Sequence, residues 1–181
     1  MKNKTAFLTA TWFKTGLIPS FLPMEMGGTY GSFFALPLCI GIVLLTRFLT
    51  PTFGFLIAFI PYWAITSLIF LAGEKSVPIT EKVLGARRDH KGKMRDRDQN
   101  CIVIDEVLGM LIACILFTNP TLSLRWEYFL YAFLLFRFFD IVKIPPSRYF
   151  DRMKNAFGVM MDDVVAGFYA GMVLGIIVIF Y

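Results

Sequence analysis

Long apolar runs dominate the chain, and short polar connections separate them. At a helical rise of about 1.5 Å per residue, about 20 apolar residues cross the roughly 30 Å hydrocarbon core of a bilayer. Five runs reach or approach that length, at residues 33–49, 53–72, 102–117, 128–144 and 160–181. The pattern therefore predicts an all-α membrane protein, a bundle of about five transmembrane helices.

A sixth apolar stretch, residues 7–23, is interrupted by Lys14, Gly16 and two prolines. Such breaks expose backbone polar groups, which are tolerated at membrane depth only where protein or water covers them. The stretch therefore suits a short or re-entrant segment better than a full span.

Composition agrees with a membrane location and a single domain. Of the 181 residues, 57% are hydrophobic and only 17% are charged, whereas a soluble domain of this size would carry more polar surface. The length is typical of one folding unit, so we expect a single domain over residues 1–181. The polar segment at about residues 73–100 is then its one long loop.

The basic residues predict how the chain is oriented. Eight of the 18 Lys and Arg residues lie between Lys75 and Arg97, and four more lie within residues 143–154. Loops rich in Lys and Arg stay in the cytoplasm, which places both segments there and Tyr181 outside. The net charge of +5 is thus better explained by anionic lipid headgroups than by nucleic acid.

Acidic residues recur at the predicted cytoplasmic end of three spans. They are Asp105 with Glu106, Asp140, and Asp162 with Asp163. A carboxylate at mid-bilayer costs roughly 2.5–3.5 kcal/mol, and less near the interface. Interfacial acids that merely mark span ends are the simpler explanation for any one pair, but three coincident groups favour a functional site. Ligands that are all oxygen suit a hard divalent cation, and we expect all five residues to bind Mg²⁺ as catalytic residues.

Two glycines are placed to bring these acidic residues together. Gly109 and Gly167 each follow an acidic residue, Asp105 and Asp163, by four positions, and so lie on the same helix faces. Small residues let neighbouring helices approach closely. We therefore expect a tight pocket.

Cations and a glycine-rich stretch supply candidate phosphate ligands. Arg137, Asp140 and Lys143 follow one another at helical spacing, which fits either a structural ladder of ion pairs or phosphate binding by Arg137 and Lys143. The stretch from Gly27 to Ser32 precedes the first span. It is typical of a turn, but its amides at a helix N-terminus could also bind an anion, so Thr29 and Ser32 join the candidates.

The three cysteines offer no competing chemistry. Cys39, Cys101 and Cys114 form no CxxC pair, and none is followed by an arginine in a Cys-x5-Arg pattern. We interpret them as packing residues rather than as disulfide partners, metal ligands or nucleophiles.

Three blocks of sequence give the chain a specific resemblance. They read IVIDEVLG at 102–109, FRFFDIVK at 136–143 and GVMMDDVVAG at 158–167, with a fainter block at Gly16–Pro19 and Gly28–Ser32. In this order and spacing the chain resembles the bacterial phosphatidylglycerophosphatase A family from Gly16 to about Gly171. It departs from the family pattern by extra residues before Gly28 and by Gln99 and Ile144, which stand where prolines are common.

The resemblance implies Mg²⁺-dependent hydrolysis of phosphatidylglycerophosphate to phosphatidylglycerol and phosphate, in glycerophospholipid synthesis. The implied location is the bacterial cytoplasmic (inner) membrane, with the active site at its cytoplasmic face. Two alternatives remain open: a phosphatase of another membrane lipid phosphate, and a small ion or solute transporter. The spacing also leaves open which carboxylate acts as general base, or whether an aspartate is a phosphorylated nucleophile.

Overall fold

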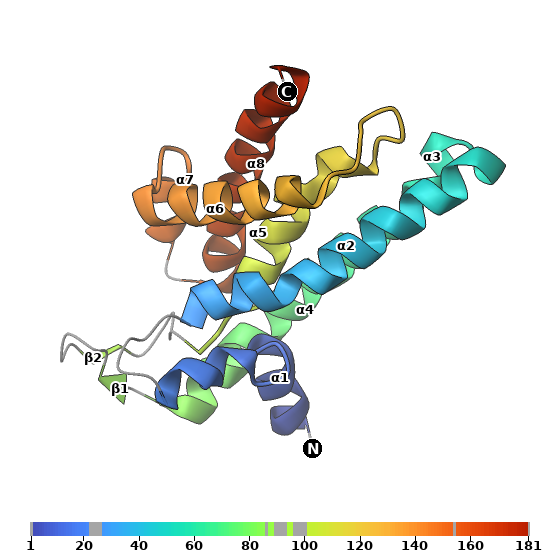
Figure 1. The fold of residues 1–181 in the computed structure, drawn as a ribbon. Helices are drawn as coiled ribbons and strands as arrows, with labels where there is room; N and C mark the ends of the chain where they lie inside the picture. The colour runs from blue at the N-terminus through green and yellow to red at the C-terminus, as the bar shows by residue number, and fades with distance from the viewer. Residues whose placement is uncertain are drawn as a thin grey trace.

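The computed structural model describes residues 2–21, 27–85, 87–88, 94–95, 101–153 and 155–180. Regular structure in these residues is helical apart from two paired antiparallel strands, β1 (Arg87–Arg88) and β2 (Met94–Arg95), which confirms the all-α class. The helices, shown in Figure 1, are α1 (Lys2–Ala10), the 3-10 helix η1 (Thr15–Phe21), α2 (Gly27–Phe53), α3 (Phe55–Ala58), α4 (Ile60–Leu84), α5 (Ile104–Cys114), the 3-10 helix η2 (Ile115–Thr118), α6 (Trp126–Val142), α7 (Ser147–Asp151) and α8 (Ala156–Phe180).

The expected count of about five spans is not confirmed. In the described residues three stretches are long and apolar enough to cross a membrane: α2, α3 with α4, and α8. Helix α5 has 11 residues and α6 has 17, so they extend only about 16 Å and 25 Å. Nine of the eleven residues of α5 are buried within the protein. Its apolar sequence therefore reflects a protein core, a distinction that hydropathy alone does not make.

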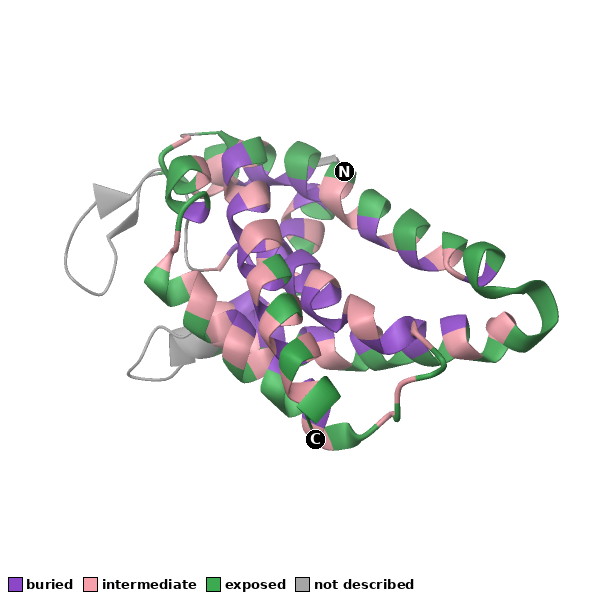
Figure 2. Ribbon diagram, turned by 90° about the horizontal axis from the view of Figure 1, so that it is seen from above, coloured by how far each residue is buried: buried purple, intermediate pink, exposed green. Residues whose placement is uncertain are grey.

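Helix α5 lies at the centre of the fold, and α2, α4, α6 and α8 all pack against it. Figure 2 shows the buried residues concentrated in this central region, while the outer faces of α2 and α4 toward their α3 end are largely exposed. Side chains from several helices fill the core, including Tyr62, Phe117 and Phe136, none of which is exposed. The Tyr62 hydroxyl donates a hydrogen bond to the carbonyl oxygen of Leu111 and so joins α4 to α5.

The N-terminal segment is short and broken, as the sequence predicts. Helix α1 packs on α4, and η1 packs on α2. The Val103 amide, just before α5, donates a 2.9 Å hydrogen bond to the carbonyl oxygen of Ala10. The segment therefore covers the start of α5, and its entry into the bilayer stays a prediction.

Helix α4 continues through the first part of the predicted loop and ends at Leu84. The rest of that loop, residues 86–100, lies outside the described residues except for β1 and β2. The basic residues Lys75 and Lys82 therefore lie on the last turns of a long helix.

Candidate active site

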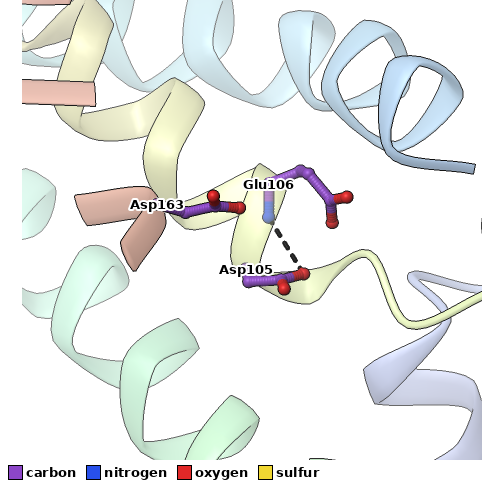
Figure 3. Close-up of side chains that lie close together, drawn as sticks. All are labelled: Asp105, Glu106 and Asp163. Carbon is purple, nitrogen blue, oxygen red and sulfur yellow. Dashed lines mark hydrogen bonds between the residues drawn. The ribbon is translucent and has the colours of Figure 1, made fainter. Parts of the chain in front are cut away.

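The structure brings five acidic residues from three helices together. Asp105 and Glu106 lie in the first turn of α5, Asp140 in the last turn of α6, and Asp162 and Asp163 near the start of α8. They form two groups, Asp105–Glu106–Asp163 and Asp140–Asp162–Asp163, in each of which one carboxylate oxygen per residue lies within 4.8 Å of the others. Figure 3 shows the first group. We call the five residues the carboxylate cluster.

Several of these carboxylates are buried, and two of them have carboxylate oxygens without a partner among the described residues. Asp105 is 6% exposed and Asp163 is 4% exposed. Oδ1 of Asp105 accepts a 3.1 Å hydrogen bond from the Glu106 amide, drawn as the dashed line in Figure 3. Asp163 accepts no hydrogen bond and forms no ion pair with any described residue, and Oε2 of Glu106 is buried without a hydrogen-bond partner there. Because a buried uncompensated charge is unfavourable, the cluster is suited to binding cations.

Close packing of α5 on α8 creates this proximity. A Cβ atom on Gly167 would overlap the carbonyl oxygen of Gly109, and one on Gly109 would lie 2.8 Å from the carbonyl oxygen of Asp163. Neither position has room for a side chain unless the helices separate. The predicted close approach at these two glycines is confirmed.

Arg137 lies between the cluster and the start of α2. Its Nη1 is 2.8 Å from Oδ2 of Asp140 and donates a 3.5 Å hydrogen bond to Oγ of Ser32. The Ser32 hydroxyl proton goes to the carbonyl oxygen of Gly28, 2.7 Å away, so Ser32 acts as an acceptor toward Arg137. Nε of Arg137 is buried without a partner among the described residues, which leaves a donor available to an anion.

The glycine-rich stretch forms the first turns of α2 rather than a preceding turn. A Cβ atom on Gly28 would overlap Oε1 of Glu106 and would lie 2.9 Å from Nη1 of Arg137. The absence of a side chain therefore lets both groups reach the first turn of this 27-residue helix, and the helix dipole favours anions at that end. Thr29 is partly buried in the same turn, and its role in binding phosphate stays a prediction.

Lys143 lies just after α6. In an intrahelical ladder it would pair with Asp140, but the structure gives it other partners. Its Nζ lies 2.5 Å from Oδ2 of Asp162 and also pairs with Asp151. Burial of the ammonium group alone would lower the pKa of Lys143, but the Asp151 and Asp162 carboxylates outweigh it and raise that pKa above its usual value. Lys143 therefore stays charged and is held against two carboxylates, while Arg137 and Asp140 form the intrahelical pair.

Sequence reasoning gave no role to two neighbours of Asp162. The Ser147 hydroxyl, at the start of α7, donates a hydrogen bond to Oδ1 of Asp162, and Asp151, at the end of α7, shares Lys143 with it. Both residues follow Pro145-Pro146, which marks a turn, but only the folded chain shows that α7 packs back on α8. Together with Lys143, Ser147 fixes the orientation of the Asp162 carboxylate.

Comparisons with known proteins relate the sequence to a family of lipid phosphatases. A family model described as Phosphatidylglycerophosphatase A matches residues 8–178. The chain is 50% identical to the Phosphatidylglycerophosphatase A of Haemophilus influenzae over 78 residues, 42% of this chain and 45% of that protein. It is 34% identical to the protein of that name from Escherichia coli over 161 residues, 88% of this chain and 76% of that protein.

A third relative carries a different name. The chain is 32% identical over 161 residues to a Bacteroides thetaiotaomicron protein provisionally named phosphatidylinositol-3-phosphatase. The match covers 87% of this chain and 94% of that protein. No solved structure matches the chain.

Proposed function

Because the chain belongs to the phosphatidylglycerophosphatase A family and is a phosphatase, we propose that it hydrolyses phosphatidylglycerophosphate to phosphatidylglycerol and phosphate in glycerophospholipid synthesis. Three apolar helices of membrane-crossing length are consistent with a lipid substrate. The observation that carries the proposal is the carboxylate cluster, which lies beside Arg137 and the N-terminus of α2. The assignment as an enzyme replaces the transporter alternative.

The residues of the cluster fit the Mg²⁺ that the reaction is expected to need. Asp105, Glu106, Asp140, Asp162 and Asp163 offer oxygen atoms alone, the donors that this hard cation prefers. Among the described residues the Asp163 carboxylate has no compensating partner and Oε2 of Glu106 has no hydrogen-bond partner, which supports binding of a cation. When bound, Mg²⁺ supplies positive charge against the phosphate oxygens and lowers the pKa of the attacking water.

Arg137 is our proposed principal ligand for the substrate phosphate. Its partners Asp140 and Ser32 hold the guanidinium in place, and its Nε, which has no partner among the described residues, is available to a phosphate oxygen. The amides in the first turn of α2, with Thr29, offer further donors nearby. Lys143 adds positive charge from the other side of the cluster, where it also holds Asp162.

The hydrolysis itself requires a water oxygen to attack phosphorus while the bond to the glycerol oxygen breaks. A carboxylate of the cluster accepts a proton of the attacking water, and the same proton is then passed to the departing glycerol oxygen, so that phosphatidylglycerol leaves as the alcohol and the carboxylate is restored. Ser147 and Lys143 bind both oxygens of Asp162, so that this carboxylate keeps one orientation throughout.

We place the site at the cytoplasmic face of the bacterial inner membrane. Eight Lys and Arg residues lie between Lys75 and Arg97, that is, around the C-terminal end of α4 and just before α5. The cluster begins in the first turn of α5 and so lies close in sequence to this basic segment. Basic segments are retained on the cytoplasmic side. Labelling of single cysteines placed near Lys75 and near the C-terminus of α8 tests this orientation, because the two labels should lie on opposite sides.

A second lipid phosphate is a specific alternative substrate. The match to the Bacteroides protein covers most of both chains, and the name of that protein indicates a phosphoinositide phosphatase. Both lipids carry a phosphate monoester on a glycerophospholipid headgroup, so the same ligands would serve either. Only the remainder of the headgroup distinguishes them.

Phosphate release by purified protein in mixed micelles tests these proposals. We expect release from phosphatidylglycerophosphate that EDTA abolishes, that Mg²⁺ restores, and that exceeds release from phosphatidylinositol 3-phosphate. Asp105→Asn and Asp163→Asn should reduce the rate by at least about 10²-fold, because each removes a charge from the site. Glu127→Gln, a matched change in the first turn of α6, should retain activity. Release without Mg²⁺, or undiminished release by both Asp variants, would contradict the catalytic assignment.

A further inference from the structure

The two acidic groups of the carboxylate cluster share one residue, Asp163. Asp105 and Glu106 belong only to the first group, and Asp140 and Asp162 only to the second. Two metal sites joined by a common carboxylate are a recurrent design in enzymes that cleave phosphate esters. We propose that the chain binds two divalent cations, one at each group, with the Asp163 carboxylate between them. The inference rests on the proposed function and adds to it the number of ions and their division among the ligands.

Asp163 occupies a position suited to this shared role. Helix α8 packs against both α5 and α6, which carry the other members of the two groups. Figure 3 shows the Asp163 side chain extending from α8 toward the first turn of α5, which carries Asp105 and Glu106. Gly109 and Gly167 lie one helical turn after Asp105 and Asp163, and their close contact therefore sets the distance between α5 and α8 at the cluster. A carboxylate has two oxygens, and so Asp163 can bind one ion with each.

The hydrogen bonding around the cluster shows where cations are needed. Asp163 is 4% exposed and has neither a hydrogen bond nor an ion pair with any described residue, although the carboxylate is directed into the cluster. Glu106 belongs only to the first group, and its buried Oε2 atom has no hydrogen-bond partner among the described residues. An ion held only by Asp140 and Asp162 would leave Glu106 uncompensated. We therefore expect the first group to bind a separate ion.

The second group also carries more negative than positive charge among the described residues. When ionised, Asp140, Asp162 and Asp163 carry three negative charges, and the paired cations Arg137 and Lys143 offset two of them. Asp151, which shares Lys143, adds a further negative charge. A divalent cation would offset this excess, so the second group is suited to an ion as well.

Manganese binding to the purified protein in detergent tests the proposal without reference to activity. Mn²⁺ replaces Mg²⁺ at oxygen sites and is paramagnetic, so equilibrium binding gives the number of ions and electron paramagnetic resonance shows whether they are coupled. We expect two Mn²⁺ per chain with a spin-coupled spectrum. Glu106→Gln and Asp140→Asn should each leave one uncoupled ion. Asp163→Asn should abolish coupling and weaken binding of both ions at least tenfold.

Controls separate the possible failures. Glu127→Gln should keep two coupled ions, and circular dichroism with size-exclusion chromatography should show that each variant is folded. One uncoupled Mn²⁺ in the wild-type protein, together with Mg²⁺-dependent phosphate release, would overturn the two-ion proposal and leave the proposed function intact. Two uncoupled ions would overturn the shared role of Asp163. No bound Mn²⁺ with EDTA-resistant phosphate release would overturn both proposals.

Discussion

Replacement of Gly167 by alanine tests whether helix proximity creates the active site. The new methyl group would overlap the carbonyl oxygen of Gly109 and would lie 3.1 Å from Cβ of Ile112. Both neighbours are parts of α5 near its backbone, so no flexible side chain can move aside. Helices α5 and α8 must separate locally by about 1 Å, because interiors are close-packed.

That separation sets the expected size of the effect. Overpacking of this kind destabilises proteins by about 1–3 kcal/mol, which should lower the thermal unfolding temperature in detergent. It also draws Asp105 and Glu106 on α5 away from Asp163 on α8. A displacement of about 1 Å in catalytic groups can reduce a rate by about 10²-fold. We therefore expect a larger loss of activity than of stability, accompanied by weaker Mn²⁺ binding.

The chain provides a matched control one turn along the same helix. A Cβ atom on Gly171 would lie 3.5 Å from its nearest neighbour, the carbonyl oxygen of Ala113, which is an ordinary contact. Gly171→Ala should therefore change stability by no more than about 1 kcal/mol and leave activity near the wild-type level. Wild-type activity and metal binding in Gly167→Ala, or equal losses in both variants, would refute the reasoning.

Three further substitutions address other parts of the site. Gly28→Ala should reduce phosphate release by roughly 10–100-fold, because its methyl group would displace Glu106 and Arg137, whereas Gly41→Ala, with no atom within 4 Å of its Cβ, should have no effect. Lys143→Met should lower the free energy of unfolding by roughly 1–3 kcal/mol in denaturant titrations, since it leaves the buried Asp162 without its ion pair; an unchanged midpoint would count against this. Ser147→Ala should weaken Mn²⁺ binding up to about tenfold without unfolding the chain, since it removes one hydrogen bond to Asp162; unaltered binding would show that Ser147 does not orient that carboxylate.

The local sequence was sufficient to predict the helical class and much of the site. Hydropathy located the three long apolar helices, because length and composition alone decide whether a helix can cross a bilayer. The acidic residues could be predicted to meet because each lies at the end of its apolar run that is predicted to face the cytoplasm, whether that end is N-terminal or C-terminal. Gly109 and Gly167 also indicated which faces of two of those helices are in contact. Each glycine follows an aspartate by four residues, and positions four apart lie on one face because a helix has about 3.6 residues per turn.

The tertiary structure decided what an apolar run lies against and which partner each charge takes. Helices α5 and α6 have the composition of membrane spans, but α5 is short and enclosed by other helices, and enclosure depends on neighbours distant in sequence. Lys143 follows Asp140 by three residues, yet it pairs with Asp162, because the chain turns back through α7 and brings α8 alongside. Local sequence determined the kinds of residue at the helix ends, and long-range packing determined that Asp163 stands between two groups of carboxylates.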